Sequence, residues 1–300
     1  KASLLAGKHV VTSNKALVAA YGTELLAIAR EKNVNFFFEA SVGGGIPIIR
    51  PLYRCLKGEK ILEITGILNG TTNFILTKMD KEGASFETVL KEAQDLGYAE
   101  RNPEADVEGY DTCRKIAILT AMATGKEVNY EDICTEGITK ITDVDFKYAD
   151  KLGTSVKLFG TSRMDGNEVH AWVAPVMIGK DHPLYMVSDV FNGILVEGNM
   201  LGTSMYYGSG AGKLPTASAV VADIIEEAQN LKSNIRLGWD AKRLEIEPML
   251  SSRHRYFVRV AGTLADKEKT VEEAFGEVRL VQMERNTHEG QLTFRIGIGL

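Results

Sequence analysis

Residues 9–40 read HVVTSNKALVAAYGTELLAIAREKNVNFFFEA, and the order of patterns in this stretch decides the fold class. Residues 9–12 are a short β-branched run, which favours a strand, whereas residues 16–31 carry apolar side chains at helical spacing. Residues 35–40 are apolar at four of six positions, which is typical of a strand buried on both faces of a parallel sheet. Strand, helix and strand in succession predict a βαβ unit and therefore an α/β fold.

A two-stranded βαβ unit leaves apolar faces without a partner, so we expect several further strands to precede it in the same domain. Residues 1–40 would then be the C-terminal part of that domain. The composition changes at SVGGGIP (41–47), a glycine loop closed by a proline, and we place a second, α+β domain with a mixed sheet at residues 41–230. The expected helices are 48–56, 71–79, 85–96, 112–124 and 216–230, and the expected strands are 61–68, 170–178, 194–197 and 205–207.

The C-terminal part of the sequence reads as a connector and a small module. Residues 231–252 are predicted to be a polar connector. Within residues 253–300, a strand at 255–261, a helix at 264–275 and a hairpin of 278–284 with 291–297 around the turn 286–290 are expected. The order βαββ indicates an incomplete regulatory module.

The composition excludes several functional classes. Hydrophobic residues make up 44% and charged residues 25%, as in ordinary globular domains, and no apolar run approaches the roughly 18 residues of a membrane span. With a net charge of −5 and scattered lysines and arginines, neither nucleic acid nor a membrane is an expected partner. The three cysteines lie outside any C-x-x-C pattern, which favours a reducing cytoplasm over a disulfide framework or a zinc site.

Asn14 and Lys15 directly follow the first predicted strand. They therefore lie at its carboxyl end, where open parallel sheets bind their ligands. A lysine there can meet a carboxylate, a phosphate or a carbonyl group. The alternative is a solvated lysine near the start of a helix, and position alone leaves both interpretations open.

The SVGGGIP loop follows Glu39 closely. Its glycines suit a tight turn. Its exposed carbonyls, together with the Glu39 carboxylate, could instead surround a hard cation. Oxygen ligands from a backbone turn suit a monovalent ion that shapes the loop better than a catalytic metal.

The densest group of charges is GYAERNPEADVEGYDTCRK, residues 97–115, with five acids ahead of a basic pair. Asp111 and Lys115 are four residues apart on a predicted helix, so they share a face and can pair. Such a pair is often a solvated salt bridge. Here the apolar run 116–119 buries the next turn, and a lysine held there can act as an acid toward a developing alkoxide. Glu100, in the preceding loop, could bind the ammonium group of an amino-acid substrate or be an ordinary loop acid.

Two glycine-containing motifs give weaker signals. NGTTN (69–73) could recognise a small polar ligand or only cap the next helix. GSGAG (208–212) before a helix resembles a phosphate-binding loop, but such a loop alone is not specific. The five histidines show no metal-ligand spacing and no G-x-S-x-G motif occurs, which argues against a hydrolase.

Taken together, five stretches resemble the successive motifs of the homoserine dehydrogenase family. They are VVTSNKALVA (10–19), FFFEASVGGGIPII (36–49), GILNGTTNFIL (66–76), DLGYAERNPEADVEGYDTCRKIAIL (95–119) and GAGKLPTASAVVADI (210–224). The resemblance covers residues 1 to about 230, and the segment from about residue 255 resembles the start of a ferredoxin-like ACT domain. It implies a Rossmann-type NAD(P)-binding domain, a catalytic and dimerisation domain and a homodimer or homotetramer. The implied reaction reduces aspartate 4-semialdehyde to homoserine with NADPH or NADH, in threonine, methionine and isoleucine synthesis.

The resemblance also implies roles for individual residues. Lys115 matches the proton donor, and Lys15 matches the lysine beside the nicotinamide, which some mechanisms make the acid instead. Substrate contacts are implied for Glu100, Asp111, Asp106, Thr71 and Gly97, and cofactor contacts for Lys15, Asn14, Gly97 and Gly210. A structural sodium site is implied at Glu39 and the carbonyls of Val42, Gly44 and Ile46.

The sequence departs from the family pattern in two places. The glycine-rich fingerprint of the first βα turn, and the residue that selects NAD or NADP, are not found in residues 1–300. We therefore expect weak or absent turnover from these residues alone. The ACT-like segment has no clear D-x-P-G turn after Val260, so threonine regulation is not predicted. The alternatives are a non-catalytic amino-acid sensor and another semialdehyde or 2-oxo acid dehydrogenase, which usually needs a catalytic Cys or His.

Overall fold

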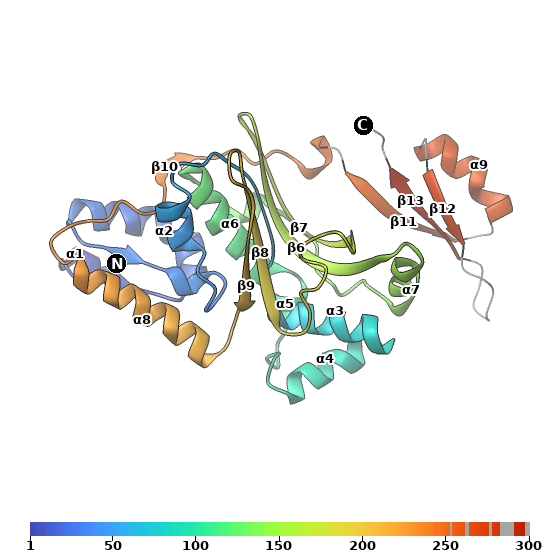
Figure 1. Cartoon of the computed structure of the whole chain (residues 1–300), viewed down its shortest axis with the longest axis horizontal. Helices are drawn as coiled ribbons and strands as arrows, with labels where there is room; N and C mark the ends of the chain where they lie inside the picture. Colours follow the sequence, from blue (N-terminus) through green and yellow to red (C-terminus); the bar gives the residue numbers. More distant parts are fainter. Residues whose placement is uncertain (253, 262–263, 276–277, 283–290, 298–300) are drawn as a thin grey trace.

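The βαβ unit is present in the computed structural model, which describes residues 1–252, 254–261, 264–275, 278–282 and 291–297. Strands β1 (Val10–Val11) and β2 (Phe36–Phe37) pair in parallel and are joined by α2 (Lys15–Glu31). The prediction of strand, helix and strand is thus confirmed, although both strands are shorter than expected. A short helix, α1 (Ala2–Leu5), precedes the unit. Figure 1 shows the unit at one end of the molecule.

A six-stranded sheet forms the centre of the molecule, in the order β5-β7-β6-β3-β8-β9. Its neighbouring strands are antiparallel except for β5 and β7, which are parallel, so the predicted mixed sheet is confirmed. The strands are β3 (Ile61–Ile67), β5 (Cys134–Thr135), β6 (Thr154–Asp165), β7 (Glu168–Gly179), β8 (Phe191–Gly198) and β9 (Gly202–Ser209). The long strand β6 was not predicted, because Lys157, Gly160 and several hydroxyl residues interrupt its apolar pattern.

Helices cover one face of this sheet and connect it to the βαβ unit (Figure 1). They are α3 (Gly70–Glu82), α5 (Glu104–Val107), α6 (Tyr110–Thr124) and α7 (Asp143–Lys151). Helix α4 (Phe86–Asp95) packs on α3, and α8 (Lys213–Gln229) packs against the βαβ unit. The predicted helices of this region, α3, α4, α6 and α8, are confirmed. Predicted helix 48–56 contains a wider π-type turn, η2 (Pro51–Cys55). None of the helices in the described residues has the length and apolar character that a bilayer crossing requires.

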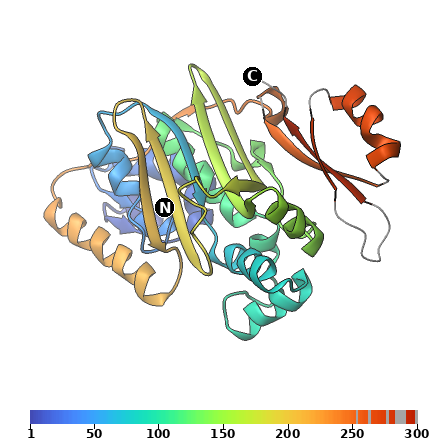
Figure 2. The same cartoon turned by 45° about the vertical axis from the view of Figure 1, so that its right-hand side comes forward.

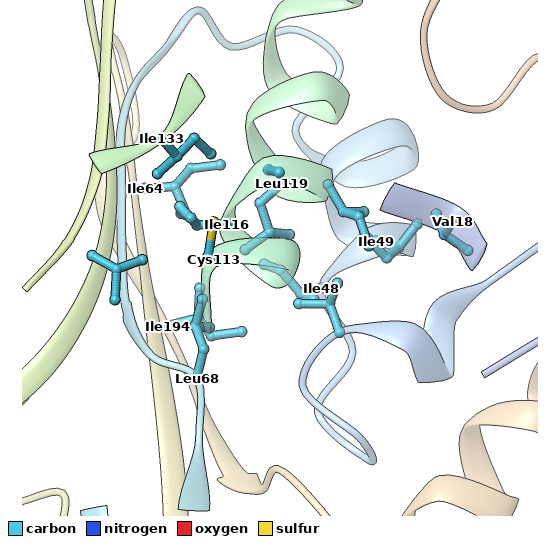
Figure 3. Packing of buried hydrophobic residues seen from close by; sticks show 14 of the residues in the cluster. Val18, Ile48, Ile49, Ile64, Leu68, Cys113, Ile116, Leu119, Ile133 and Ile194 are labelled. Atoms are coloured by element: carbon cyan, nitrogen blue, oxygen red, sulfur yellow. The ribbon is translucent and has the colours of Figure 1, made fainter. Parts of the chain in front are cut away.

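Helix α6 is the buried centre of the core. Ten of its residues are buried, and it contacts both α2 and the sheet. Figure 3 shows Ile116 directed toward Ile64 and Ile194 of the sheet, while Leu119 lies toward Ile49 on the other side. Because the helix is packed on two sides, its polar first turn is held in a fixed position between the sheet and the βαβ unit.

The segment predicted to be a polar connector instead packs back onto the βαβ unit. It contains β10 (Asp240–Arg243), which pairs in parallel with β4 (Lys126–Glu127). Trp239 is 4% exposed, its ring meets Phe38 at 5.9 Å, and its Nε1 donates to Thr23 Oγ1 at 2.9 Å. Leu237, Trp239 and Leu244 of this segment are therefore part of the core. Its charged residues concealed this from the sequence pattern.

The C-terminal module has the predicted βαββ order. Its elements are β11 (Arg255–Ala261), α9 (Leu264–Phe275), β12 (Val278–Gln282) and β13 (Gln291–Gly297), with antiparallel strands in the order β11-β13-β12. The predicted turn 286–290 lies outside the described residues. In Figure 2 the module lies beyond the central sheet. Its contacts include Arg259 Nε with Asp145 Oδ1 at 3.2 Å and the His254 ring against Trp172 at 4.9 Å.

The remaining elements are single turns of 3₁₀ helix. They are η1 (Glu39–Ser41), η3 (Tyr130–Asp132) and η4 (Met249–Ser251). The predicted strand 35–40 ends early because η1 turns the chain immediately after β2. This turn leads the chain from the sheet edge into the glycine loop.

We expect Trp239→Ala to lower the free energy of unfolding by about 3–5 kcal/mol, because it leaves a cavity between the 231–252 segment and α2. Chemical denaturation of the two proteins measures this difference. Arg236→Ala is the control, since its side chain is 79% exposed in the same segment. A Trp239 variant as stable as the Arg236 variant would show that the segment does not contribute to the core.

Candidate active site

One buried carboxylate joins two lysines from different parts of the chain. Asp111 lies in the first turn of α6, and its Oδ2 is 2.7 Å from Nζ of Lys115 one turn later. Its Oδ1 is 2.8 Å from Nζ of Lys15, the first residue of α2. The predicted pair is confirmed, and the structure adds Lys15 to it. Asn14 is the N-cap of α2, and its Oδ1 accepts the Leu17 N–H at 3.0 Å.

Burial and the two lysines together determine the pKa of Asp111. The side chains of Asp111 and Lys115 are 4% and 10% exposed, whereas that of Lys15 is 43% exposed. Burial alone would raise the pKa of Asp111, but the charges of Lys115 and Lys15 outweigh it and hold this pKa well below its usual range. Asp111 is therefore ionised throughout the neutral range.

The end of strand β3 completes the anchoring of the lysine. The Leu68 carbonyl accepts a hydrogen bond from Lys115 Nζ at 2.6 Å. Asn69 Nδ2 donates to Asp106 Oδ1 at 2.7 Å and to Asp111 Oδ2 at 2.9 Å. Burial raises the pKa of Asp106, and the negative charge of Asp111 adds to this, although the Asn69 hydrogen bond opposes it. Asn69 of the NGTTN motif thus caps α3 and also connects two acids.

Lys115 retains a free donor. An ammonium has three N–H groups, and Asp111 and the Leu68 carbonyl accept two of them. Within the described residues no third acceptor is present. A buried ammonium with one free N–H can hydrogen-bond to, and protonate, an oxygen that gains negative charge.

Gly97 and Glu100 lie on the neighbouring loop, and Thr71 lies in the first turn of α3. Thr71 Oγ1 donates to the Tyr98 carbonyl at 2.6 Å, which fastens the loop to the start of α3. Gly97 has φ +76°, a conformation that favours glycine, directly after α4. Glu100 is exposed, and its side chain makes no hydrogen bond or ion pair with the described residues of the Asp111 cluster. The structure therefore brings Asp106 to the cluster but leaves the Glu100 side chain outside it.

Two glycine loops meet on the other side of the site. A Cβ on Gly44, whose φ is +57°, would lie 2.5 Å from the carbonyl oxygen of Gly210. The Gly45 N–H donates to the Ser209 carbonyl at 3.2 Å. SVGGGIP and GSGAG are therefore in backbone contact, which no larger residue at position 44 would permit. Their separation in sequence hides this relation.

The carboxylate of Glu39 binds backbone N–H groups that follow the glycine loop. Its Oε1 accepts the N–H groups of Ile48 and Ile49 at 2.7 and 2.9 Å, and its Oε2 accepts that of Arg50 at 2.7 Å. Burial is the largest influence on its pKa and raises it. The carboxylate is used to cap the turn that begins after Pro47. By contrast, no N–H of the described residues donates to the carbonyls of Val42, Gly44 or Ile46.

Arg50 extends this group of charges to helix α8. It pairs with Asp223 at 2.6 Å and with Glu226 at 2.6 Å, and the Glu39 N–H donates to Asp223 Oδ2 at 2.9 Å. Burial raises the pKa of Asp223 to about 7. These contacts fix α8, and with it the end of the GSGAG loop, against the βαβ unit.

Asn192 on β8 was missed by the sequence analysis. Its side chain is fully buried, and neither Nδ2 nor Oδ1 has a hydrogen-bond partner. It lies beside Gly210 and Gly70. A single asparagine at the start of a strand gives no signal in the sequence, because only the three-dimensional packing makes it unusual.

A cavity of about 620 Å³ lies elsewhere, between the central sheet and the C-terminal module. Its lining includes Trp172, His182 and His254 and none of the Asp111 cluster. Groups of three or more His, Cys, Asp or Glu side chains that could hold a metal ion do not occur among the described residues. The Asp111 cluster thus combines buried charge and a free donor in a way that this cavity does not.

Comparison with known proteins identifies close relatives. The family model for homoserine dehydrogenase matches residues 47–225. Homoserine dehydrogenase from Bacillus subtilis is 47% identical over 233 residues, covering 78% of this chain and 54% of the relative. The Synechocystis homoserine dehydrogenase is 46% identical over 258 residues, covering 85% and 58%. The chain thus spans about half the length of the curated relatives it matches.

Solved structures give the same result. The crystal structure of a homoserine dehydrogenase from Thiobacillus denitrificans has a TM-score of 0.88 and 39% identity, covering 98% of this chain and 70% of that one. A mutant of a hyperthermophilic archaeal homoserine dehydrogenase, solved in complex with NADPH, has a TM-score of 0.66 and 34% identity. The match covers 76% of this chain and 66% of that one. The central sheet and the βαβ unit therefore have the arrangement seen in these enzymes.

We expect Asp111→Asn to lower the free energy of unfolding at pH 7 by about 3–5 kcal/mol, because it leaves buried Lys115 without its counter-charge. The folded-state pKa of Asp111 is lowered, so its contribution is present above the ordinary value of about 3.9 and is lost as the pH falls below it. Denaturation of both proteins from pH 7 to pH 2 measures the difference, which should shrink below about pH 4.

Asp143→Asn is the matched control. Asp143 pairs with Lys147 at 2.8 Å, also four residues away, but 44% of its side chain is exposed. Such a pair contributes about 0.3–0.5 kcal/mol. An equal loss in both variants would contradict the assignment of Asp111 as a buried anchor.

Proposed function

The chain belongs to the homoserine dehydrogenase family, and on this premise we propose that the protein catalyses the reversible NAD(P)-dependent reduction of L-aspartate 4-semialdehyde to L-homoserine. The observation that carries the proposal is the carboxylate of Asp111, which holds Lys15 and Lys115 together in a largely buried site. This reaction is a step in threonine, methionine and isoleucine synthesis.

Lys115 is the proposed proton donor. When bound, the reduced nicotinamide supplies a hydride to the aldehyde carbon. Lys115 gives a proton to the aldehyde oxygen as its negative charge develops, so the product is a neutral alcohol and the lysine becomes an amine. Asp111 and the Leu68 carbonyl hold the ammonium in place and so direct its free N–H.

Lys15 is the alternative donor. It also contacts Asp111, but its side chain is more exposed than that of Lys115, 43% against 10%. A more exposed lysine exchanges its proton with water readily and gains less from a dry environment. We therefore assign it the place beside the nicotinamide, where its position at the carboxyl end of β1 supports it.

The substrate would be bound by the acids around this cluster. Its α-ammonium group requires a carboxylate, and Asp106 lies next to Asp111 through Asn69. Glu100 would approach from the exposed loop that Thr71 fastens at Tyr98. Gly97 gives this loop its tight turn at the end of α4. We propose these residues as the substrate-binding group, with Asp111 as the fixed centre.

The cofactor would be NADPH or NADH. Its proposed contacts, besides Lys15, are Asn14 at the end of β1 and the backbone of Gly97 and Gly210. Gly210 lies at the contact of the two glycine loops, where the missing side chains of Gly44 and Gly210 let the loop backbones pack closely and so fix the backbone that we propose for this contact. The archaeal relative solved with NADPH supports a nicotinamide cofactor as well.

A sodium ion would stabilise the SVGGGIP loop. The carbonyls of Val42, Gly44 and Ile46 fit this role, since no N–H of the described residues occupies them. Glu39 would contribute its backbone carbonyl, because its carboxylate is already bound to three N–H groups. The ion would hold the loop in place and take no part in proton transfer.

We also propose a homodimer or homotetramer in the cytoplasm. Phe191 and Tyr207 stack at 5.4 Å on the outer strands and are 37% and 55% exposed, and Met205 on β9 is 42% exposed. Apolar side chains gathered on one sheet face favour contact with a second subunit. The three cysteines are free thiols, which suits the reducing cytoplasm.

A second candidate function is amino-acid sensing without catalysis. The cavity of about 620 Å³ beside the C-terminal module favours it, because its lining offers both charged and aromatic side chains, such as Asp145 and Trp172. Saturable threonine binding by a protein that does not reduce the semialdehyde would support this function. Semialdehyde reduction would exclude it.

The first test is cofactor oxidation with aspartate 4-semialdehyde, measured on the full-length protein. We expect Lys115→Met to lower kcat by about 10²–10⁴-fold, the usual contribution of general acid catalysis. Lys15→Met should mainly raise the KM for the cofactor. Lys140→Met, with a side chain 82% exposed, is the control and should be fully active. If only Lys15→Met lowered kcat, Lys15 would be the proton donor and Lys115 would not.

The sodium proposal has a separate test. Replacing sodium chloride by choline chloride at equal ionic strength should lower the unfolding temperature, because an ion bound only by the folded state stabilises it by mass action. Potassium and lithium chloride show whether the effect depends on ion size. Equal unfolding temperatures in all four salts would contradict the proposal that the loop carbonyls bind an ion.

A further inference from the structure

The side chain of Asn192 is unusual because its hydrogen-bonding capacity is unused. It is fully buried, and neither its Nδ2 donor nor its Oδ1 acceptor has a partner among the described residues. Buried amide groups are nearly always paired, since an unpaired one destabilises the folded state. A group of this kind that persists in a well-packed core requires an explanation.

The position of Asn192 connects it to the proposed active site. A Cβ on Gly210 would lie 2.0 Å from its Nδ2, and a Cβ on Gly70 would lie 3.6 Å from its Oδ1. Gly70 directly follows Asn69, which holds Asp111, and Gly210 contacts Gly44 of the other glycine loop. The amide of Asn192 is thus situated between the lysine cluster and the two glycine loops.

The residues around Asn192 hold it in this place. Asn73 Nδ2 donates to the carbonyls of Asp189 and Phe191 at 3.1 and 3.0 Å. Lys157 Nζ donates to the carbonyl of Val187 at 2.6 Å. The segment before Asn192 is therefore pinned at several points, and on β8 its backbone pairs with Gly208 of β9. Asn192 cannot turn away to find water without breaking these contacts.

The GSGAG loop covers the amide of Asn192. The GSGAG loop lies across Asn192 through Gly210, and no hydrogen bond joins it to the amide. Gly212 at the end of the loop has φ +112°, a conformation restricted to glycine. A ligand would reach the amide only where this loop gives way, so the proposal requires the loop to shift when the ligand binds.

We propose that Asn192 is a specificity-determining residue that recognises the carboxamide of the nicotinamide ring. A carboxamide offers an N–H donor and a carbonyl acceptor, which match the free acceptor and donor of Asn192. The ends of the amino-acid substrate are charged and are better matched by Asp106 and the lysines. This inference rests on the proposed function only in taking a nicotinamide cofactor as the ligand.

The test is Asn192→Leu in the full-length protein, with NADPH binding measured by fluorescence titration. We expect the Kd for NADPH to rise about tenfold or more, since a lost amide pair is typically worth this much. The unfolding temperature without cofactor should stay equal or rise, because leucine removes two unsatisfied polar atoms. Asn199→Leu at the other end of the same strand pair is the control, and it should change neither Kd nor KM.

A cofactor analogue gives a second readout. The 3-acetylpyridine analogue keeps the carbonyl of the carboxamide but lacks its N–H donor. The wild type should therefore prefer the nicotinamide cofactor, and Asn192→Leu should lose this preference. A merely structural role would weaken both cofactors equally.

Three results would overturn the inference. They are an unchanged Kd for NADPH, a higher KM for the semialdehyde alone, and a lower unfolding temperature of the Asn192 variant without cofactor. Failure of the proposed function is recognised separately. A wild-type protein that binds NADPH but does not reduce the semialdehyde would refute the proposed reaction. The pairing of Asn192 with the carboxamide would still be tested by the Kd for NADPH of the wild type and of Asn192→Leu.

Discussion

The rest of the structure depends on one buried negative charge. Asp111 is ionised in a nearly dry position only because Lys15 and Lys115 lie within 2.8 Å of its two oxygens. Meeting that requirement fixes the first turn of α6, the first residue of α2 and the end of β3 relative to one another. Removal of one partner would leave an uncompensated charge, so the three elements must fold together. The packing of α6 on both sides supplies the rigidity that this arrangement needs.

The sequence predicted those features that depend on local pattern. The βαβ unit, helix α6 and the pairing of Asp111 with Lys115 follow from periodicity and from a spacing of four residues. The contact of Lys15 with Asp111 joins residues 96 positions apart, and no spacing rule links them. The role of the Glu39 carboxylate stayed open for a related reason. Its three N–H partners become available only when the chain turns after Pro47, and the sequence alone does not reveal this turn.

Burial also separates what could be predicted from what could not. Strand β6 carries a lysine and several hydroxyl residues and lacks a clear alternation, yet most of it is buried, and the helices α3, α6 and α7 pack against it. The charged segment around Trp239 conceals a tryptophan that fills the space above Gly22. Asn192 is the clearest example, since only the absence of partners in three dimensions distinguishes it from other polar residues. The burial of these residues is a property of the folded chain and is not visible in the local sequence.

The sequence has two tryptophans, and the fold places one beside the βαβ unit and the other on β7 of the central sheet. Trp239 is packed against Phe38 of the βαβ unit, and Trp172 meets His254 next to the C-terminal module. The protein therefore carries two intrinsic fluorophores, each beside a different quencher or ring. Emission from a protein that keeps only one of the two indoles would report on one region alone, either the βαβ unit or the contact between the central sheet and the C-terminal module. The order in which these two regions lose their structure could therefore be observed without any attached dye.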